Sequence, residues 1–134
     1  MTEECFLFDS SIWIDLIRGK VHKGIQREAK RLLAEEKVVV SPIVILEILR
    51  GSRSESEYRK REENFKALPS LSVTDLVWEK SYHLAFVLRQ RGFLFPLSDI
   101  LIAATAIHYD YTLMHTDKHF ETIARHSTLK TSTL

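Results

Sequence analysis

Four acidic residues are candidates for chemistry because each stands where an apolar segment ends or where apolar neighbours surround it. Asp9 directly follows a short apolar run, and Asp117 lies two residues beyond another such run. Asp99 stands at the start of the most apolar helical segment, and Glu47 is set among isoleucines, leucines and a valine. Carboxylates are rare in such surroundings unless something pairs with them, so we take these four acids as the candidate functional residues.

A cluster of carboxylates repels itself, which raises carboxyl pKa values unless a cation neutralises the charge. Oxygen ligands suit a hard cation, and the chain holds a single cysteine, Cys5, so no group of thiolates for zinc can form. The residue types therefore indicate Mg²⁺ or Mn²⁺ as the cofactor, provided that the fold brings the acids together.

Each acid also has a purely structural explanation, which the sequence leaves open. Asp9, Asp99 and Asp117 could each cap the helix that follows. Glu47 could be a solvated helix residue whose neighbours happen to be apolar. The conjunction of four acids at compatible places in one fold is what favours a site.

Short apolar strands alternate with helices along the chain, which predicts an α/β fold with a short central parallel sheet flanked by helices on both faces. The expected strands are 5–8, 38–40, 71–73, 112–115 and 128–130. The expected helices are 12–17, capped by Ser10 or Ser11, then 22–36, 43–50, 54–67, 75–88 and 100–108, and one that holds Phe120 and Ile123.

Parallel strands end at one edge of their sheet, and such sheets bind ligands beyond these carboxyl ends. Asp9 and Asp117 should both emerge there. The helices that start from this edge should bring Asp99 and one turn of the helix with Glu47 close to them.

The composition excludes several classes of protein. With 134 residues, of which 45% are hydrophobic and 28% charged, we expect one folded domain over residues 1–134 rather than a disordered chain. A net charge of +1 excludes a polycationic nucleic-acid binder. Neither a signal-peptide pattern nor an apolar run of about 20 residues is found, so we expect a cytoplasmic protein without membrane contact.

Four segments together resemble the PIN-domain family, in particular the VapC-type toxins of bacterial and archaeal toxin–antitoxin pairs. The segments are Phe8–Ser11, Ser41–Gly51, Pro96–Ala106 and Leu113–Phe120. They occur in the family's order and spacing and span almost the whole chain. The resemblance implies a PIN-like fold and a metal-dependent ribonuclease.

The resemblance also assigns roles to individual residues. The family's catalytic and metal-binding acids match Asp9, Glu47, Asp99 and Asp117. Ser10 and Thr116 match hydroxyl residues that support these acids. His115 departs from the pattern, because an apolar or small residue is more usual at this strand end. His115 and His119 are four apart but straddle a predicted strand–helix junction, so they need not share a helical face. The other four histidines have no motif around them, and we expect surface or supporting positions.

Hydrolysis of an RNA phosphodiester is the chemistry that the resemblance implies. The phosphate is anionic and its leaving oxygen is poor, so ions held by carboxylates would neutralise it, activate a water and stabilise the departing alkoxide. The products would carry a 5′-phosphate and a 3′-hydroxyl. The implied function is an endoribonuclease that serves as the toxin of a VapBC-type module, and a role in RNA maturation stays open. The alternative is a PIN-like RNA- or protein-binding regulatory module without significant turnover.

Partners follow from the resemblance and from local charge. Residues 18–31 carry six basic residues against one acid, and the candidate RNA contacts among them are Arg18, Lys20, Lys23 and Arg27. A solvated helix face would explain the same charges. The resemblance further implies a cognate antitoxin and a homodimer. The apolar helix faces with Ile12 and Trp13, and with Ile45 and Leu49, are candidate contact surfaces that core packing would explain equally well.

Overall fold

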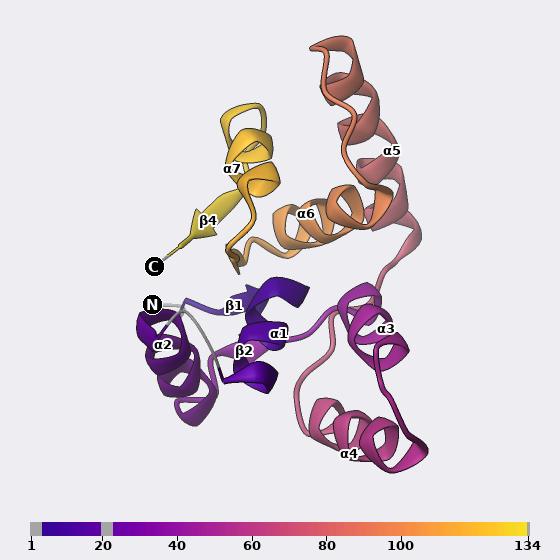
Figure 1. The fold of residues 1–134 in the computed structure, drawn as a ribbon. Coiled ribbons are helices and arrows are strands. Elements are labelled where there is room, and N and C mark those ends of the chain that lie inside the picture. The colour runs from indigo at the N-terminus through magenta and orange to yellow at the C-terminus, as the bar shows by residue number, and fades with distance from the viewer. Residues whose placement is uncertain (1–3, 20–22, 134) are drawn as a thin grey trace.

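Four short parallel strands form the centre of the computed structural model, which describes residues 4–19 and 23–133 (Figure 1). The strands are β1 (Phe6–Phe8), β2 (Val38–Val39), β3 (Thr112–Met114) and β4 (Lys130–Ser132). They lie in the order β2-β1-β3-β4, and each neighbouring pair is parallel. The carboxyl ends of all four strands therefore share one edge of the sheet, which confirms the predicted parallel α/β fold.

Seven helices surround this sheet in the described part of the chain. They are α1 (Ser10–Arg18), α2 (Lys23–Ala34), α3 (Pro42–Arg50), α4 (Glu55–Lys66), α5 (Asp75–Gln90), α6 (Leu97–Tyr109) and α7 (Lys118–Arg125). Figure 1 shows α1 to α4 with β1 and β2 in one half of the view, and α5 to α7 with β4 in the other half. None of the described helices combines the length and apolar character that a membrane span requires.

Both faces of the sheet are covered, as the residues of its central strands show. Leu7 and Phe8 in β1 point to opposite faces because side chains alternate along a strand, and both are fully buried. Leu113 and Met114 in β3 are equally buried. Continuous apolar strands of this kind are typical of parallel sheets between helical layers.

Trp13 belongs to the core rather than to a contact surface. Its ring packs against Phe8 at a centroid distance of 5.4 Å and against Phe65 of α4 at 5.2 Å. Ile12 beside it is fully buried. The interpretation of this helix face as a partner surface is therefore wrong, because the interior of the protein already covers it.

α6 is the central helix of the fold, as its apolar sequence predicts. The residues from Ile100 to Ala106 are all buried, and the helix packs against α5. It begins at Leu97, after Pro96 in an extended conformation, three residues earlier than expected. Asp99 therefore lies inside the first turn of α6 and does not cap it.

Three further expectations are corrected by the structure. Residues 71–73 form no strand, since the isolated bridge at this place joins the preceding residue, Ser70, to Val40. Asp9, rather than Ser10 or Ser11, caps α1. The last strand is 130–132 rather than 128–130, because Ser127 still bonds to the last turn of α7 through Ile123.

Candidate metal centre

The ends of β1 and β3 bring Asp9 and Asp117 to the same edge of the sheet. The backbone N–H of Asp9 donates to the carbonyl of Met114 at 3.0 Å, which ties the two strand ends together. Both acids also cap helices: the carboxylate of Asp9 accepts from the N–H of Ser11, and that of Asp117 accepts from the N–H of His119. Capping thus fixes the direction of both carboxylates without using all of their oxygen lone pairs.

Ser11 connects the two segments a second time. Its hydroxyl donates to Oδ2 of Asp9 at 2.8 Å and accepts the backbone N–H of Thr116 at 3.2 Å. Thr116 itself is exposed, and its contact with Ser11 is through the backbone rather than through its hydroxyl. The sequence suggested only a capping role for Ser11, because nothing in its spacing indicates a bond to a residue 105 positions away.

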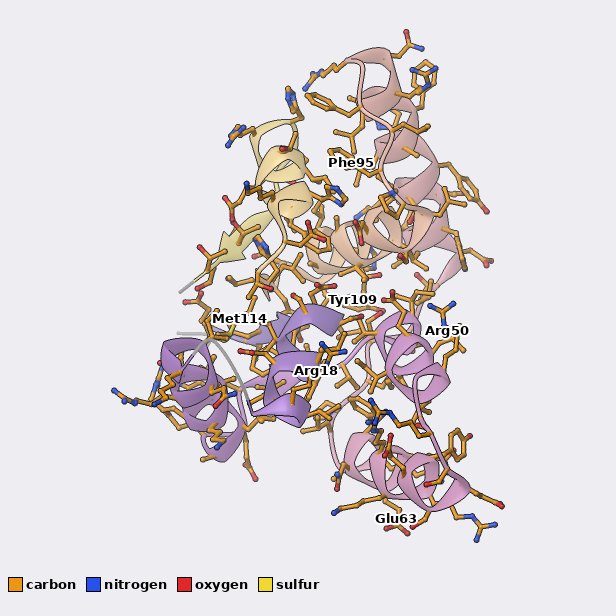
Figure 2. All side chains as sticks on the ribbon, viewed as in Figure 1. Arg18, Arg50, Glu63, Phe95, Tyr109 and Met114 are labelled. Carbon is orange, nitrogen blue, oxygen red and sulfur yellow. The ribbon has the colours of Figure 1, made fainter. Side chains whose placement is uncertain are left out.

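Asp99, Asp117 and His119 form the tightest group of potential ligands among the described residues. One ligand atom from each lies within 4.8 Å of the others. Nδ1 of His119 is 2.9 Å from Oδ2 of Asp99 and 3.6 Å from Oδ1 of Asp117. The ring of Phe95, from the α5–α6 connection, packs against the same imidazole at 5.2 Å, and Figure 2 shows Phe95 between α5 and α7.

Glu47 lies on α3 and is hydrogen-bonded to the first turn of α1. The hydroxyl of Ser10 donates to Oε1 of Glu47 at 2.7 Å. Its neighbours explain the orientation, because Ile48 is buried and Leu46 is 61% exposed, which leaves Glu47 half-buried between them. Glu47 is not part of the tight group of Asp99, Asp117 and His119, and its link to the segment after Asp9 is the bond from Ser10.

The electrostatics of the site favour a cation. Burial raises the pKa of Asp99, and the nearby carboxylates of Asp117 and Asp9 raise it further, while the bond from His119 acts in the opposite direction. The bond to Asp99 raises the pKa of His119, and the charge of Asp117 adds to this effect. Asp9 and Asp117 are thus close enough to disfavour the charged form of Asp99, and the imidazole of His119 offsets part of this repulsion.

The donor set fits a hard divalent ion. The acids present carboxylate oxygens at one edge of the sheet, with Asp9 buried and Asp99 largely buried. Oxygen ligands of this kind suit Mg²⁺ or Mn²⁺, and His119 would suit Mn²⁺ as well.

The candidate RNA contacts lie on two different helices. Arg18, in the last turn of α1, lines a cavity of about 360 Å³ that Glu47 also lines, and Figure 2 shows Arg18 between α1 and α3. Arg53 and Arg61 line the same cavity. Lys23 and Arg27 are exposed on α2, and Lys20 lies outside the described residues. The structure thus separates Arg18, which is near Glu47, from the basic residues of α2.

Comparison with known proteins finds relatives that match almost the whole chain. The sequence model of the PIN domain family matches residues 6–126. The chain is 30% identical over 128 residues to the VapC ribonuclease Mb1587 of Mycobacterium bovis, a match that covers 92% of this chain and 95% of the relative. The ribonuclease VapC11 of Mycobacterium tuberculosis matches with the same identity and coverage.

Solved structures share the fold. VapBC2 from Rickettsia felis, bound to a DNA fragment from its promoter, superposes with a TM-score of 0.81 at 20% identity and covers 97% of this chain and 98% of that one. VapC20 of Mycobacterium tuberculosis, described as a sarcin–ricin loop cleaving toxin, superposes with a TM-score of 0.64 at 18% identity, over 87% of this chain and 93% of that one.

Proposed function

This chain belongs to the PIN-domain family, and we propose that it is a metal-dependent endoribonuclease that acts in the cytoplasm as the toxin of a VapBC-type toxin–antitoxin module. A nuclease that hydrolyses RNA agrees with the names of its curated relatives. The observation that supports the metal dependence is the group of Asp99, Asp117 and His119, whose ligand atoms lie within 4.8 Å of one another, with Asp9 near enough to act on the charge of Asp99.

Asp9, Glu47, Asp99 and Asp117 would hold the ion. When bound, Mg²⁺ or Mn²⁺ would neutralise the scissile phosphate, activate the attacking water and stabilise the leaving 3′-oxygen. The chain's own part is to hold these carboxylates in place before the substrate arrives. Ser11 orients Asp9, Ser10 orients Glu47, and the backbone of Thr116 is tied to Ser11.

RNA would approach along the cavity beside Glu47. Its wall carries Arg18, Arg53 and Arg61, which can contact phosphates on either side of the scissile bond. Arg61 is partly engaged already, since it pairs with Glu57 at 2.7 Å. Lys20, Lys23 and Arg27 are the other proposed RNA contacts, and the last two lie on α2, apart from this cavity. Binding through such residues should weaken steeply as the salt concentration rises.

A cognate antitoxin is proposed as the protein partner. Several proteins of the same fold were solved as VapBC complexes, among them the Rickettsia felis and Salmonella typhimurium complexes on DNA. Co-expression of the neighbouring open reading frame with this chain should relieve any growth arrest that the chain causes alone. Arrest that persists in the presence of the neighbour's product would count against an adjacent antitoxin.

A homodimer is proposed through an exposed apolar face on α5 and α6. We define the apolar face as Trp78, Tyr82, Phe86 and Leu97. The aromatic residues are four apart and so share one side of α5, and Leu97 lines a cavity of about 330 Å³ together with Trp78 and Tyr82. Their exposed fractions run from 42% for Trp78 to 82% for Leu97.

The size of the apolar face agrees with a second copy of the chain as its partner. Four such side chains expose roughly 100 Å² or more each. Together they approach the nonpolar area of one side of a standard interface, which is about 800 Å² and slightly more than half nonpolar. A patch of this kind on a water-soluble surface indicates an interaction site.

The test is a map of new RNA ends after the chain is expressed in a bacterial host. Wild-type protein should create discrete new 5′-phosphate ends, and Asp9→Asn should create none. Asp110→Asn is the matched control, because Asp110 is exposed at the opposite end of β3 and asparagine tolerates its left-handed backbone conformation. Identical maps for the wild type and Asp9→Asn would favour the alternative, a binding module without turnover. Products with 2′,3′-cyclic phosphates would contradict attack by water.

A further inference from the structure

His115 is buried directly after β3, and both of its ring nitrogens have partners. The side chain is 1% exposed. Its Nδ1 is 3.1 Å from the backbone nitrogen of Asp117, and its Nε2 is 2.9 Å from Oε1 of Glu121. We infer that His115 is a positioning residue for the metal centre: its Nδ1 accepts the N–H of Asp117 and thereby fixes the direction of that carboxylate. This inference rests on the proposed role of Asp117 as a metal ligand.

The hydrogen bonds determine which nitrogen of His115 carries the proton. A backbone N–H can only donate, so Nδ1 must offer its lone pair to Asp117. The ring proton is then on Nε2 and is donated to the carboxylate of Glu121, in the manner by which a carboxylate selects the tautomer of a histidine. Oε1 of Glu121 also accepts the hydroxyl of Thr131 at 3.0 Å, so β4 in turn holds Glu121.

Asp117 is therefore held at two points, its backbone and its side chain. Its N–H is bound by His115, and its carboxylate accepts from the N–H of His119 at the start of α7. The acid is 40% exposed, so packing alone does not restrict it. These two bonds therefore restrict the orientation of Asp117 and of its carboxylate.

An apolar side chain at position 115 could fill the space of the imidazole but could not accept the N–H of Asp117. The imidazole packs against Phe120 at a centroid distance of 5.2 Å, a contact that leucine could replace. Leucine has no acceptor for the N–H of Asp117. The polar function of His115 can therefore be separated from its packing by substitution.

Two substitutions each keep one of the two hydrogen bonds that the imidazole makes. In His115→Asn the amide oxygen lies near the place of Nδ1 and can still accept from Asp117, while the bond to Glu121 is lost. In His115→Gln the amide reaches the place of Nε2 and can still donate to Glu121, while the acceptor for Asp117 is lost. His115→Leu removes both bonds, and Asp110→Asn serves as the remote control.

Each purified protein is titrated with Mn²⁺ in an isothermal titration calorimeter. Its melting temperature is measured separately, without metal. Loss of a residue that orients a metal ligand typically weakens binding about 10- to 100-fold. We expect Mn²⁺ affinity to fall about 10-fold in His115→Gln and His115→Leu and to stay close to wild type in His115→Asn and Asp110→Asn. A merely structural His115 would instead lower the melting temperature of all three His115 variants and leave the affinity unchanged, which would overturn the inference.

Failure of the proposed function gives a different result. If wild-type protein bound no Mn²⁺, the acids around Asp99 would not form a metal centre, and the inference about His115 would be wrong as well. The hydrogen bond itself has a readout that needs no metal: a scalar coupling across it, from the amide of Asp117 to Nδ1 of His115, in ¹⁵N-labelled protein. The coupling should be present in the wild type, and its absence would overturn the inference whatever the metal affinity.

Discussion

The carboxylate of Asp9 has two functions at once, since it caps α1 and is one of the acids that act on the charge of Asp99. Asparagine caps helices about as well as aspartate but is neutral. We therefore expect Asp9→Asn to keep the wild-type free energy of unfolding and to reduce RNA cleavage about 100-fold or more. Asp9→Ala should lose RNA cleavage and also about 1 kcal/mol of stability, because alanine cannot cap α1. Urea unfolding and cleavage of the mapped target RNA measure the two effects, and an active Asp9→Asn protein would exclude Asp9 from the site.

His119 should report the charge of the acids around Asp99 directly. Its pKa is raised chiefly by the bond to Asp99, so the charged pair stabilises the metal-free protein below the ordinary histidine pKa, and this stabilisation is lost as the pH rises through the folded-state value. In an NMR titration of the metal-free protein, Asp99→Asn should lower the pKa of His119. Saturating Mg²⁺ should lower it too, because a divalent ion replaces the imidazolium as the positive charge. A pKa that responds to neither change would mean that His119 stands apart from the acids.

The sequence indicated the four acids but not the imidazole that accompanies them. The acids were visible because carboxylates are conspicuous at the ends of apolar segments. His119 lies in a polar stretch, and its contact with Asp99 spans 20 residues, a spacing with no periodic meaning. His115 was noted only as a departure from the family's pattern, because a sequence does not show which histidine is buried or what its nitrogens contact.

At the scale of helices and strands, the pattern of apolar residues predicted the parallel sheet and the order of its elements. The pattern predicted one strand and one helix boundary wrongly, because local contacts decide them. The segment 71–73 has the apolar composition of a strand, yet its backbone bonds to Val40, beyond the end of β2, and to the hydroxyl of Tyr109. The start of α6 was placed too late because Ser98 and Asp99 are both residues that commonly cap helices, whereas the helix begins at Leu97, directly after the extended Pro96.

Ser11 joins two of these elements, because its hydroxyl links the start of α1 to the segment after β3. We expect Ser11→Ala to lower the free energy of unfolding by about 1 kcal/mol and to weaken Mn²⁺ binding up to about 10-fold. The matched control is Ser54→Ala, which removes a hydroxyl that accepts the N–H of Glu57 at the start of α4. It should lose similar stability with no change in Mn²⁺ binding. Equal Mn²⁺ affinity in both variants would mean that Ser11 only stabilises the fold.

At the scale of the whole molecule, the apolar face and the metal centre adjoin each other on α6. Leu97 and Asp99 lie in the same first turn, yet Leu97 is 82% exposed while the carboxylate of Asp99 is only 14% exposed. The turn thus presents an apolar side chain outward and an acid inward. A second copy bound to the apolar face would therefore lie within one helical turn of Asp99.

This arrangement predicts that single charges on α5 will separate the two copies without unfolding either one. Tyr82 is 66% and Phe86 60% exposed, so Tyr82→Glu or Phe86→Glu should leave the melting temperature of the monomer nearly unchanged, while a carboxylate buried without a partner should disrupt the interface. Tyr58→Glu is the matched control, since Tyr58 is a partly exposed aromatic residue on α4, away from the apolar face. Light scattering after gel filtration should give a dimer for the wild type and Tyr58→Glu and a monomer for the two α5 variants. A dimer that survives both α5 substitutions would place the interface elsewhere, and a monomeric wild type would contradict the homodimer itself.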